Sequence, residues 1–212
     1  MNEARLARFE AAMQSLPLVA ILRGLPPEDA EAAAQTLLEA GFRLIEVPLN
    51  SPDPFTSIAT MRQVLPPEVL VGASTVMSAA QVRQLADIGA DLMVTPHTDP
   101  VLIAAAKAAG LVSLPGFFTP SEAFAALAAG ATALKLFPAE QAGPATVKAL
   151  RAVLPASARV LPVGGVSPET LATWRAAGVA GFGLGSALYG KGTTVAELGE
   201  RARRFVAAWR AS

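Results

Sequence analysis

The apolar positions of this chain gather in short runs rich in Val, Ile and Leu, and each run is followed by an Ala-rich segment with helical spacing. Many of the helical segments open with Pro, Ser or Thr and end before Gly, as helices commonly do. The pattern predicts helices that include residues 27–40, 78–88, 119–129 and 167–177. It also predicts eight strands, at residues 18–22, 44–47, 70–73, 92–95, 112–114, 133–137, 159–163 and 181–185.

The predicted strands lack a clean alternation of apolar and polar residues, which is typical of parallel strands buried on both faces. Eight such strands, each followed by a helix, favour a closed (β/α)8 TIM barrel over an open doubly wound sheet. Residues 1–16 mix Glu3 and Glu10 with Arg5 and Arg8, which suits an extra N-terminal helix on the surface better than a targeting peptide. No linker or charge block divides the chain, so we expect residues 1–212 to form a single domain.

The amino-acid composition indicates which kinds of binding partner the protein can have. A chain of 212 residues with 52% hydrophobic content can bury one large core. Its 17 basic and 17 acidic side chains cancel, which argues against the basic stripe that nucleic-acid binding needs. No apolar run approaches the roughly 18 residues of a membrane span. The lack of Cys fits a reducing compartment, so we expect a cytoplasmic protein that binds a small neutral or anionic metabolite.

Lys135 stands out because it interrupts the apolar run of residues 133–137, near the end of the sixth predicted strand. A buried ammonium is unfavourable unless it is paired or its pKa falls. If the barrel mouth lowers this pKa, the neutral amine can attack a ketone and form a Schiff base. The alternative is a structural ion pair with Glu46 inside the barrel. The pattern alone gives the two interpretations similar weight.

Glu46 is a second charge within an apolar strand, so it is expected either to pair with a cation or to act as a general acid and base. Together with Lys135 it forms the minimal set for retro-aldol cleavage, an amine that makes the iminium and a base that moves protons. Arg23 directly follows the first strand and could hold a substrate carboxylate. An Arg at a strand end is also often a simple loop cap.

Glycine-rich turns follow the last two predicted strands, at Gly164-Gly165 and at Gly185-Ser186. Barrels frequently bind phosphate with these two loops, because glycine lets backbone N–H groups approach an anion. A phosphate site is therefore favoured over turns with a purely structural role.

Neither a metal nor an organic cofactor is expected. The spacing of Gly181, Gly183 and Gly185 differs from the dinucleotide fingerprint. Zinc-dependent aldol cleavage would draw on several imidazole or thiolate ligands, whereas the chain has one His and no Cys. The one histidine, His97, either lines the mouth of the barrel or has only a structural role in its loop. We do not include it among the catalytic residues.

Jointly, the motifs resemble the bacterial family of 2-dehydro-3-deoxy-phosphogluconate and 2-dehydro-3-deoxy-6-phosphogalactonate aldolases over nearly the whole chain. The resemblance rests on Ile21-Leu22-Arg23-Gly24, Glu46-Val47-Pro48-Leu49-Asn50-Ser51-Pro52, Gly72-Ala73-Ser74-Thr75-Val76, Thr95-Pro96, Lys135-Leu136-Phe137-Pro138, Gly164-Gly165-Val166 and Gly185-Ser186. It implies an α/β barrel that assembles as a homotrimer. It also implies a class I aldolase, which needs no cofactor and splits a phosphorylated keto-deoxy sugar acid into pyruvate and glyceraldehyde 3-phosphate.

The resemblance also assigns roles to residues. Lys135 would form the Schiff base, and Glu46 would be the general acid and base. Arg23 and Thr75 would hold the keto-acid end of the substrate. The phosphate would be held by three residues of the last two turns, Gly165, Gly185 and Ser186.

Two positions bear on the substrate. The gluconate branch of the family typically has Arg four residues after the catalytic Glu, whereas this chain has Asn50, as in the galactonate branch. We therefore expect the galactonate substrate, with a gluconate or dual-substrate aldolase as the alternative. Ser74 replaces a Gly that is usual in the family, and its effect is not assigned. The alternative functions are isomerisation or decarboxylation without covalent chemistry, pyridoxal-phosphate binding and phosphosugar binding.

Overall fold

The computed structural model describes residues 3–212, in which strands and helices alternate along the chain. The strands are β1 Leu18–Ile21, β2 Leu44–Pro48, β3 Leu70–Ser74, β4 Leu92–Val94, β5 Val112–Leu114, β6 Gly116–Phe117, β7 Leu134–Leu136, β8 Val160–Pro162 and β9 Phe182–Leu184. The α-helices are α1 Glu3–Ser15, α2 Ala30–Ala40, α3 Pro54–Val64, α4 Ala79–Asp87, α5 Pro100–Ala108, α6 Pro120–Ala129, α7 Ala139–Arg151, α8 Leu171–Ala176 and α9 Val195–Ala211. Short 3-10 turns, Pro27–Asp29 and Pro168–Thr170, precede α2 and α8.

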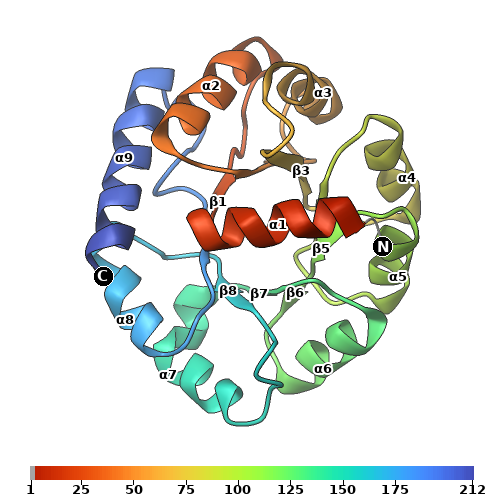
Figure 1. The fold of residues 1–212 in the computed structure, drawn as a ribbon, viewed down its shortest axis with the longest axis vertical. Coiled ribbons are helices and arrows are strands. Elements are labelled where there is room, and N and C mark those ends of the chain that lie inside the picture. Colours follow the sequence, from red (N-terminus) through yellow and green to blue (C-terminus); the bar gives the residue numbers. More distant parts are fainter. Residues whose placement is uncertain (1–2) are drawn as a thin grey trace.

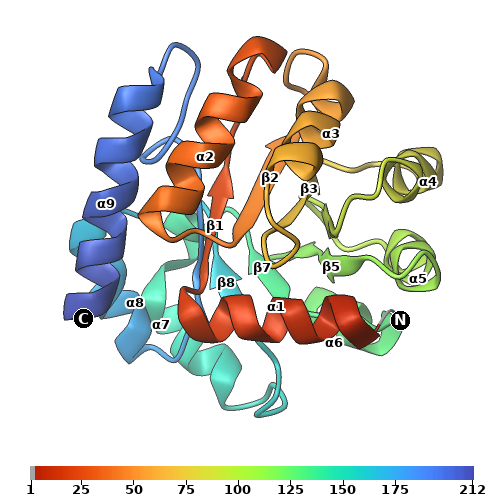
Figure 2. The same ribbon diagram turned by 45° about the horizontal axis from the view of Figure 1, so that its top comes forward.

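All strand pairs are parallel, and they form two sheets with the orders β5-β4-β3-β2-β1-β9 and β6-β7-β8. Helices α2 to α9 surround the strands, and α1 lies across one end of them (Figures 1 and 2). The predicted α/β fold with parallel strands and an N-terminal helix is thus confirmed. The full TIM barrel is not, because the strands are divided between two sheets.

The sequence pattern missed one strand. The strand predicted at residues 112–114 is confirmed as β5, but a further short strand, β6, follows on the far side of Pro115. Proline has no N–H to donate to a ladder, so it interrupts regular pairing. Strand β5 pairs with β4, whereas β6 pairs with β7. The backbone carbonyl of Pro115 still accepts a hydrogen bond from the N–H of Lys135, at 2.9 Å.

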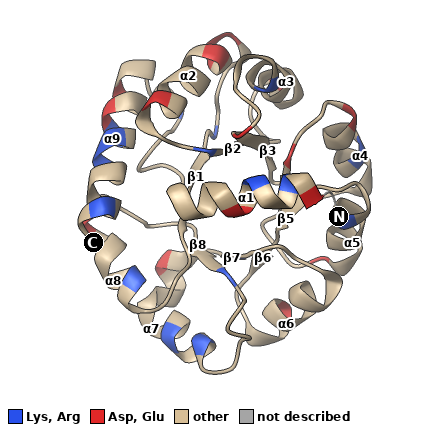
Figure 3. Cartoon of the chain, viewed as in Figure 1, with Lys and Arg blue, Asp and Glu red and all other residues tan. Residues whose placement is uncertain are grey.

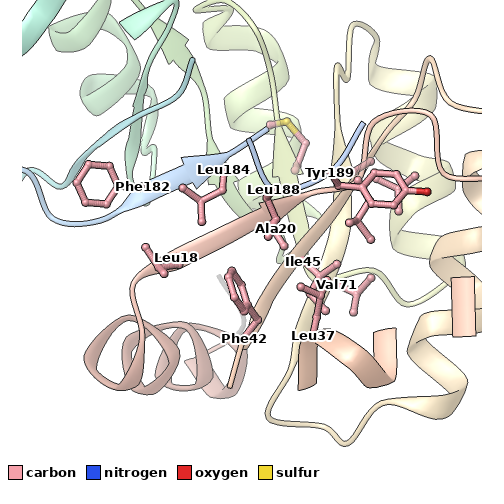
Figure 4. Close-up of a cluster of buried hydrophobic side chains, with 14 of the residues drawn as sticks. Leu18, Ala20, Leu37, Phe42, Ile45, Val71, Phe182, Leu184, Leu188 and Tyr189 are labelled. Atoms are coloured by element: carbon pink, nitrogen blue, oxygen red, sulfur yellow. The ribbon is translucent and has the colours of Figure 1, made fainter. Parts of the chain in front are cut away.

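Residues along each strand alternate between two hydrophobic clusters, as the period of two in a strand requires. The outer cluster lies between strands and helices and includes Leu18, Ala20, Ile45, Val71 and Leu184 (Figure 4). The interior cluster combines Phe9, Ala12 and Met13 of α1 with Val19, Leu44, Leu70, Leu92, Val94, Val112, Leu114, Ala133 and Leu161. Helix α1 therefore closes the amino end of the strands with apolar side chains.

A buried carboxylate fastens α1 in place. Charged residues lie mainly on the helices and connecting loops (Figure 3), but Asp91 is only 2% exposed and immediately precedes β4. Its carboxylate pairs with Arg5 at 3.0 Å and Arg8 at 2.7 Å, both from α1, and with Arg62 of α3 at 3.5 Å. It also accepts a hydrogen bond from the N–H of Val71, at 3.3 Å. No helix within residues 3–212 is long and apolar enough to cross a membrane.

Replacing this carboxylate tests its structural role. The variant Asp91→Ala leaves three arginines facing one another at a largely buried position, and breaking such a pair typically destabilises a protein by about 3–5 kcal/mol. We expect a loss of that order in urea unfolding followed by circular dichroism. The exposed pair of Glu169 and Arg204 offers the control, since Glu169→Ala should leave the midpoint unchanged. Equal midpoints for the native protein and Asp91→Ala would contradict this role.

Candidate active site

The alternation of the strands places both predicted catalytic residues on the interior face. Lys135 stands between Leu134 and Leu136, which belong to the outer cluster, so its side chain points the opposite way. Glu46 shares the face of Leu44, an interior residue of the same strand. The two side chains help to line one small cavity, together with Val19, Ile21, Val94, Leu114, Leu161, Val163 and Gly183. Its volume of about 10 Å³ is close to the space that one water molecule needs.

Burial dominates the electrostatics of this pair. Glu46 is 1% exposed and Lys135 is 6% exposed. Burial raises the pKa of Glu46, and the nearby Lys135, Ser74 and Arg23 oppose that rise. Burial likewise lowers the pKa of Lys135, the Glu46 carboxylate opposes the fall, and Arg23 adds to it. Each group is thus shifted toward its neutral form, which is what a nucleophilic amine and a proton-transfer acid need.

The alternative of a structural ion pair is not supported. The ion pairs of residues 3–212 involve Asp91, Glu10 and Glu169, and none joins Lys135 to Glu46. Within residues 3–212, the Oε2 atom of Glu46 is buried and has no hydrogen-bond partner. The Lys135 ammonium instead lies over the ring of Phe137, with Nζ 4.9 Å from the ring centroid.

A wider cleft of about 470 Å³ opens above this cavity. Four of its lining residues have a role that the family resemblance implies, namely Lys135, Arg23, Gly185 and Ser186. The other lining residues are Ile21, Gly24, Asn50, Phe137, Val163, Gly164, Tyr189, Gly190 and Lys191. Such a volume lies within the range of small-molecule sites. The cleft therefore gathers residues that follow β1, β2, β7, β8 and β9.

Arg23 is fixed by a neighbour. Its Nη1 donates to the side-chain oxygen of Asn50 at 2.7 Å, and the N–H of Gly24 donates to Ser51 Oγ at 3.0 Å. The turn after β2 therefore holds the turn after β1. Asn50 thus supports a cationic group that lies near both Lys135 and Glu46.

Two predicted binding residues do not line the cleft. Thr75 directly follows β3 with a φ of 58°, which is strained for a β-branched residue. Gly165 lies in a turn covered by Glu140, since a Cβ at Gly165 would lie 2.7 Å from the Cβ of Glu140. The Glu140 Oε2 would likewise lie 2.2 Å from a Cβ at Gly164. An acidic side chain thus occupies one side of the glycine turn.

The sequence pattern missed Tyr189 and Lys191. Lys191 lines the cleft beside Gly24. The N–H of Gly190 donates to Thr193 Oγ1 at 3.1 Å, which closes the turn that carries Lys191. Its position between Gly190 and Gly192, shortly after the predicted phosphate turn, was the available signal. Periodicity cannot place such a loop residue.

Comparisons with known proteins bear on the family of the chain. The family model described as KDPG and KHG aldolase matches residues 9–199. The chain belongs to this family. It is therefore an aldolase, a carbon–carbon lyase, of a family that works through a Schiff base.

Three relatives are especially similar to this aldolase. A probable 2-dehydro-3-deoxy-6-phosphogalactonate aldolase of Rhizobium meliloti is 50% identical over 91% of both chains. The 2-dehydro-3-deoxy-6-phosphogalactonate aldolase of Escherichia coli is 47% identical, over 92% of this chain and 95% of the relative. The solved structure described as native KDPGal superposes with a TM-score of 0.91 at 46% identity, covering 92% of this chain and 95% of the other.

The shifted pKa of Lys135 yields a test. Trapping with pyruvate and cyanoborohydride should reach half its maximal rate below pH 10.5, the ordinary lysine pKa. Because the Glu46 carboxylate raises the pKa of Lys135, Glu46→Gln should move this midpoint to still lower pH. Adduct mass measured across a pH series gives both midpoints. A native midpoint at or above 10.5, or an upward shift in Glu46→Gln, would rule out this electrostatic account.

Proposed function

We propose that this aldolase cleaves 2-dehydro-3-deoxy-6-phosphogalactonate to pyruvate and D-glyceraldehyde 3-phosphate. The observation that carries the proposal is a buried lysine beside a buried carboxyl at the base of a cleft with cationic residues. Within residues 3–212 no ion pair joins this lysine to a carboxylate. Galactonate is favoured because relatives with that name are 47% and 50% identical. The gluconate epimer is the alternative substrate.

The proposed first steps form the iminium. The neutral amine of Lys135 attacks the C2 ketone of the substrate, and the resulting carbinolamine loses water to give a protonated iminium. Glu46, directly or through water, delivers the proton that the departing hydroxyl needs. Burial raises the pKa of Glu46, which favours the protonated carboxyl that this step needs.

Cleavage then follows from the electron demand of the iminium. Glu46, now a carboxylate, removes the proton of the C4 hydroxyl, and the C3–C4 bond breaks. Its electrons pass into the iminium, which becomes the enamine of pyruvate, while C4 leaves as the aldehyde of glyceraldehyde 3-phosphate. Protonation of the enamine at C3 and hydrolysis by water release pyruvate and restore Lys135.

The substrate has an anionic group at each end, a carboxylate and a phosphate, and each needs positively charged or N–H groups to bind it. We assign the keto-acid end to Arg23 and Thr75, since Arg23 lies close enough to shift both catalytic groups. We assign the phosphate to the turns that carry Gly165, Gly185 and Ser186. Gly185 and Ser186 line the cleft, and Lys191 adds a positive charge to the same lining.

The resemblance supports a larger assembly and a closed barrel, which we also propose. Chain continuity through Pro115 and the parallel bridge between Val163 and Gly183 would join the two sheets into one ring. Exposed apolar residues on and near α4, α5 and α6 are available for a homotrimer contact, namely Met77, Val101, Phe118 and Phe124. The molecular mass in solution tests the trimer. The single domain and the cytoplasmic location stay predictions.

Covalent trapping tests the proposed mechanism. Intact-protein mass spectrometry after incubation with pyruvate and borohydride should show one adduct that peptide mapping locates on Lys135. The adduct should vanish in Lys135→Ala and persist in Lys148→Ala, which changes an exposed lysine of α7. A folded native protein that forms no adduct would exclude Schiff-base chemistry and favour non-covalent proton transfer or binding.

The choice of substrate has its own test. We expect kcat/KM for the phosphorylated galactonate to exceed that for its gluconate epimer by about tenfold or more, which corresponds to about 1.4 kcal/mol of transition-state binding. A coupled assay that measures pyruvate release from each epimer provides the ratio. Equal values of kcat/KM for the two epimers would indicate a dual-substrate enzyme. A higher value for the gluconate epimer would overturn the assignment.

A further inference from the structure

Ser74 belongs to the quoted motifs, and the proposed function leaves its hydroxyl unused. It ends β3, and Leu70 of the same strand belongs to the interior cluster. Because side chains alternate along a strand, Ser74 shares the interior face with Leu70 and Gly72. Only 1% of Ser74 is exposed. A hydroxyl therefore projects into the dry interior at the carboxyl end of the strands.

The neighbouring strand brings this hydroxyl to the general acid and base. Strands β2 and β3 are paired with Glu46 opposite Gly72 and Pro48 opposite Ser74. Gly72 has no side chain, and a Cβ there would lie 2.1 Å from the carbonyl oxygen of Leu92. No side chain on β3 therefore separates Ser74 from the carboxylate of Glu46 on the adjacent strand.

One buried oxygen of each partner lacks a hydrogen bond of normal geometry. Within residues 3–212, Ser74 Oγ and Glu46 Oε2 are buried polar atoms without a hydrogen-bond partner. Such atoms are uncommon in folded proteins, because burial removes their water. The hydroxyl nevertheless lies close enough to oppose the rise in the pKa of Glu46. Catalytic hydrogen bonds are often long in empty sites and tighten only when substrate binds.

We propose that Ser74 is a positioning residue for Glu46, whose hydroxyl closes a hydrogen bond on the Glu46 carboxylate when substrate fills the cleft. The proposal rests on the proposed aldolase function. The bond fixes the direction in which Glu46 presents its lone pair to the C4 hydroxyl. At the cleavage step the bond also favours the carboxylate form of Glu46, and this form removes the C4 proton.

The charged groups that face Glu46 are Lys135 on β7 and Arg23 after β1, and both favour the carboxylate. Tyr189 and Lys191 line the outer cleft. Since Lys135 and Arg23 are unchanged in a Ser74 variant, a shift in the titration of Glu46 would report the lost hydroxyl. Removing a hydrogen bond to the charged form raises the carboxyl pKa, so the base form disappears at a higher pH than in the native enzyme.

The pH profile of kcat/KM tests this role. In Ser74→Ala the acid limb should move to higher pH by about half a unit to one unit, and kcat at neutral pH should fall about threefold to tenfold. Ser74→Thr retains the hydroxyl and should keep the native limb. Ser113→Ala is the matched control, because Ser113 is a buried serine on β5 between the interior residues Val112 and Leu114.

The outcomes separate this inference from the proposed function. Ser74→Ala should fold with an unchanged or higher melting temperature, because it removes a buried hydroxyl without a hydrogen-bond partner. Pyruvate trapping on Lys135 should persist in this variant. If trapping succeeds but the acid limb of Ser74→Ala coincides with the native one, Ser74 has no positioning role. If the native protein itself fails to trap pyruvate, the aldolase mechanism fails first.

Discussion

The site depends on one constraint, which is that a lysine amine must sit in the dry interior of a set of parallel strands. A strand has a period of two, so Lys135 faces inward because Leu134 and Leu136 pack outward against the helices. The same period turns Glu46 inward beside Leu44. Water is largely excluded from both groups, and their shifts toward the neutral forms follow from that burial. The fold thus produces the reactive amine without a cofactor in the proposed mechanism.

Keeping this interior dry requires that the opposite end of the strands be closed. Helix α1 meets that need, since Phe9, Ala12 and Met13 complete the interior cluster. A helix that only covers an opening has few backbone links to the strands, so its attachment depends on side chains. Asp91 supplies it through Arg5 and Arg8, while a separate ion pair joins Glu10 of α1 to Arg159. Stability at one end therefore supports chemistry at the other, as barrels generally divide these roles.

Much of this arrangement could be predicted from the sequence. Hydrophobic runs located the strands, and a charge inside such a run marked Lys135 and Glu46, because burial of a charge is rarely accidental. The division into β5 and β6 at Pro115 was missed, because strands of three and two residues are too short to show a hydrophobic pattern of their own. Lys191 was missed because loop conformation depends on local hydrogen bonds, here the one from Gly190 to Thr193. Glu140 covers the glycine turn only through tertiary packing, which periodicity does not encode.

The distribution of charge in the cleft has a further consequence for the order of events. Arg23 favours the neutral amine of Lys135 and the charged form of Glu46. A substrate carboxylate bound at Arg23 would screen that cation, so both effects would weaken as substrate enters. The weaker influence of Arg23 would favour the protonated form of Glu46 at the stage when the carbinolamine must lose water. Iminium formation restores a positive charge at Lys135, which again favours the carboxylate that cleavage needs. The protonation state of Glu46 can therefore follow the reaction through the charges around it, without movement of the strands.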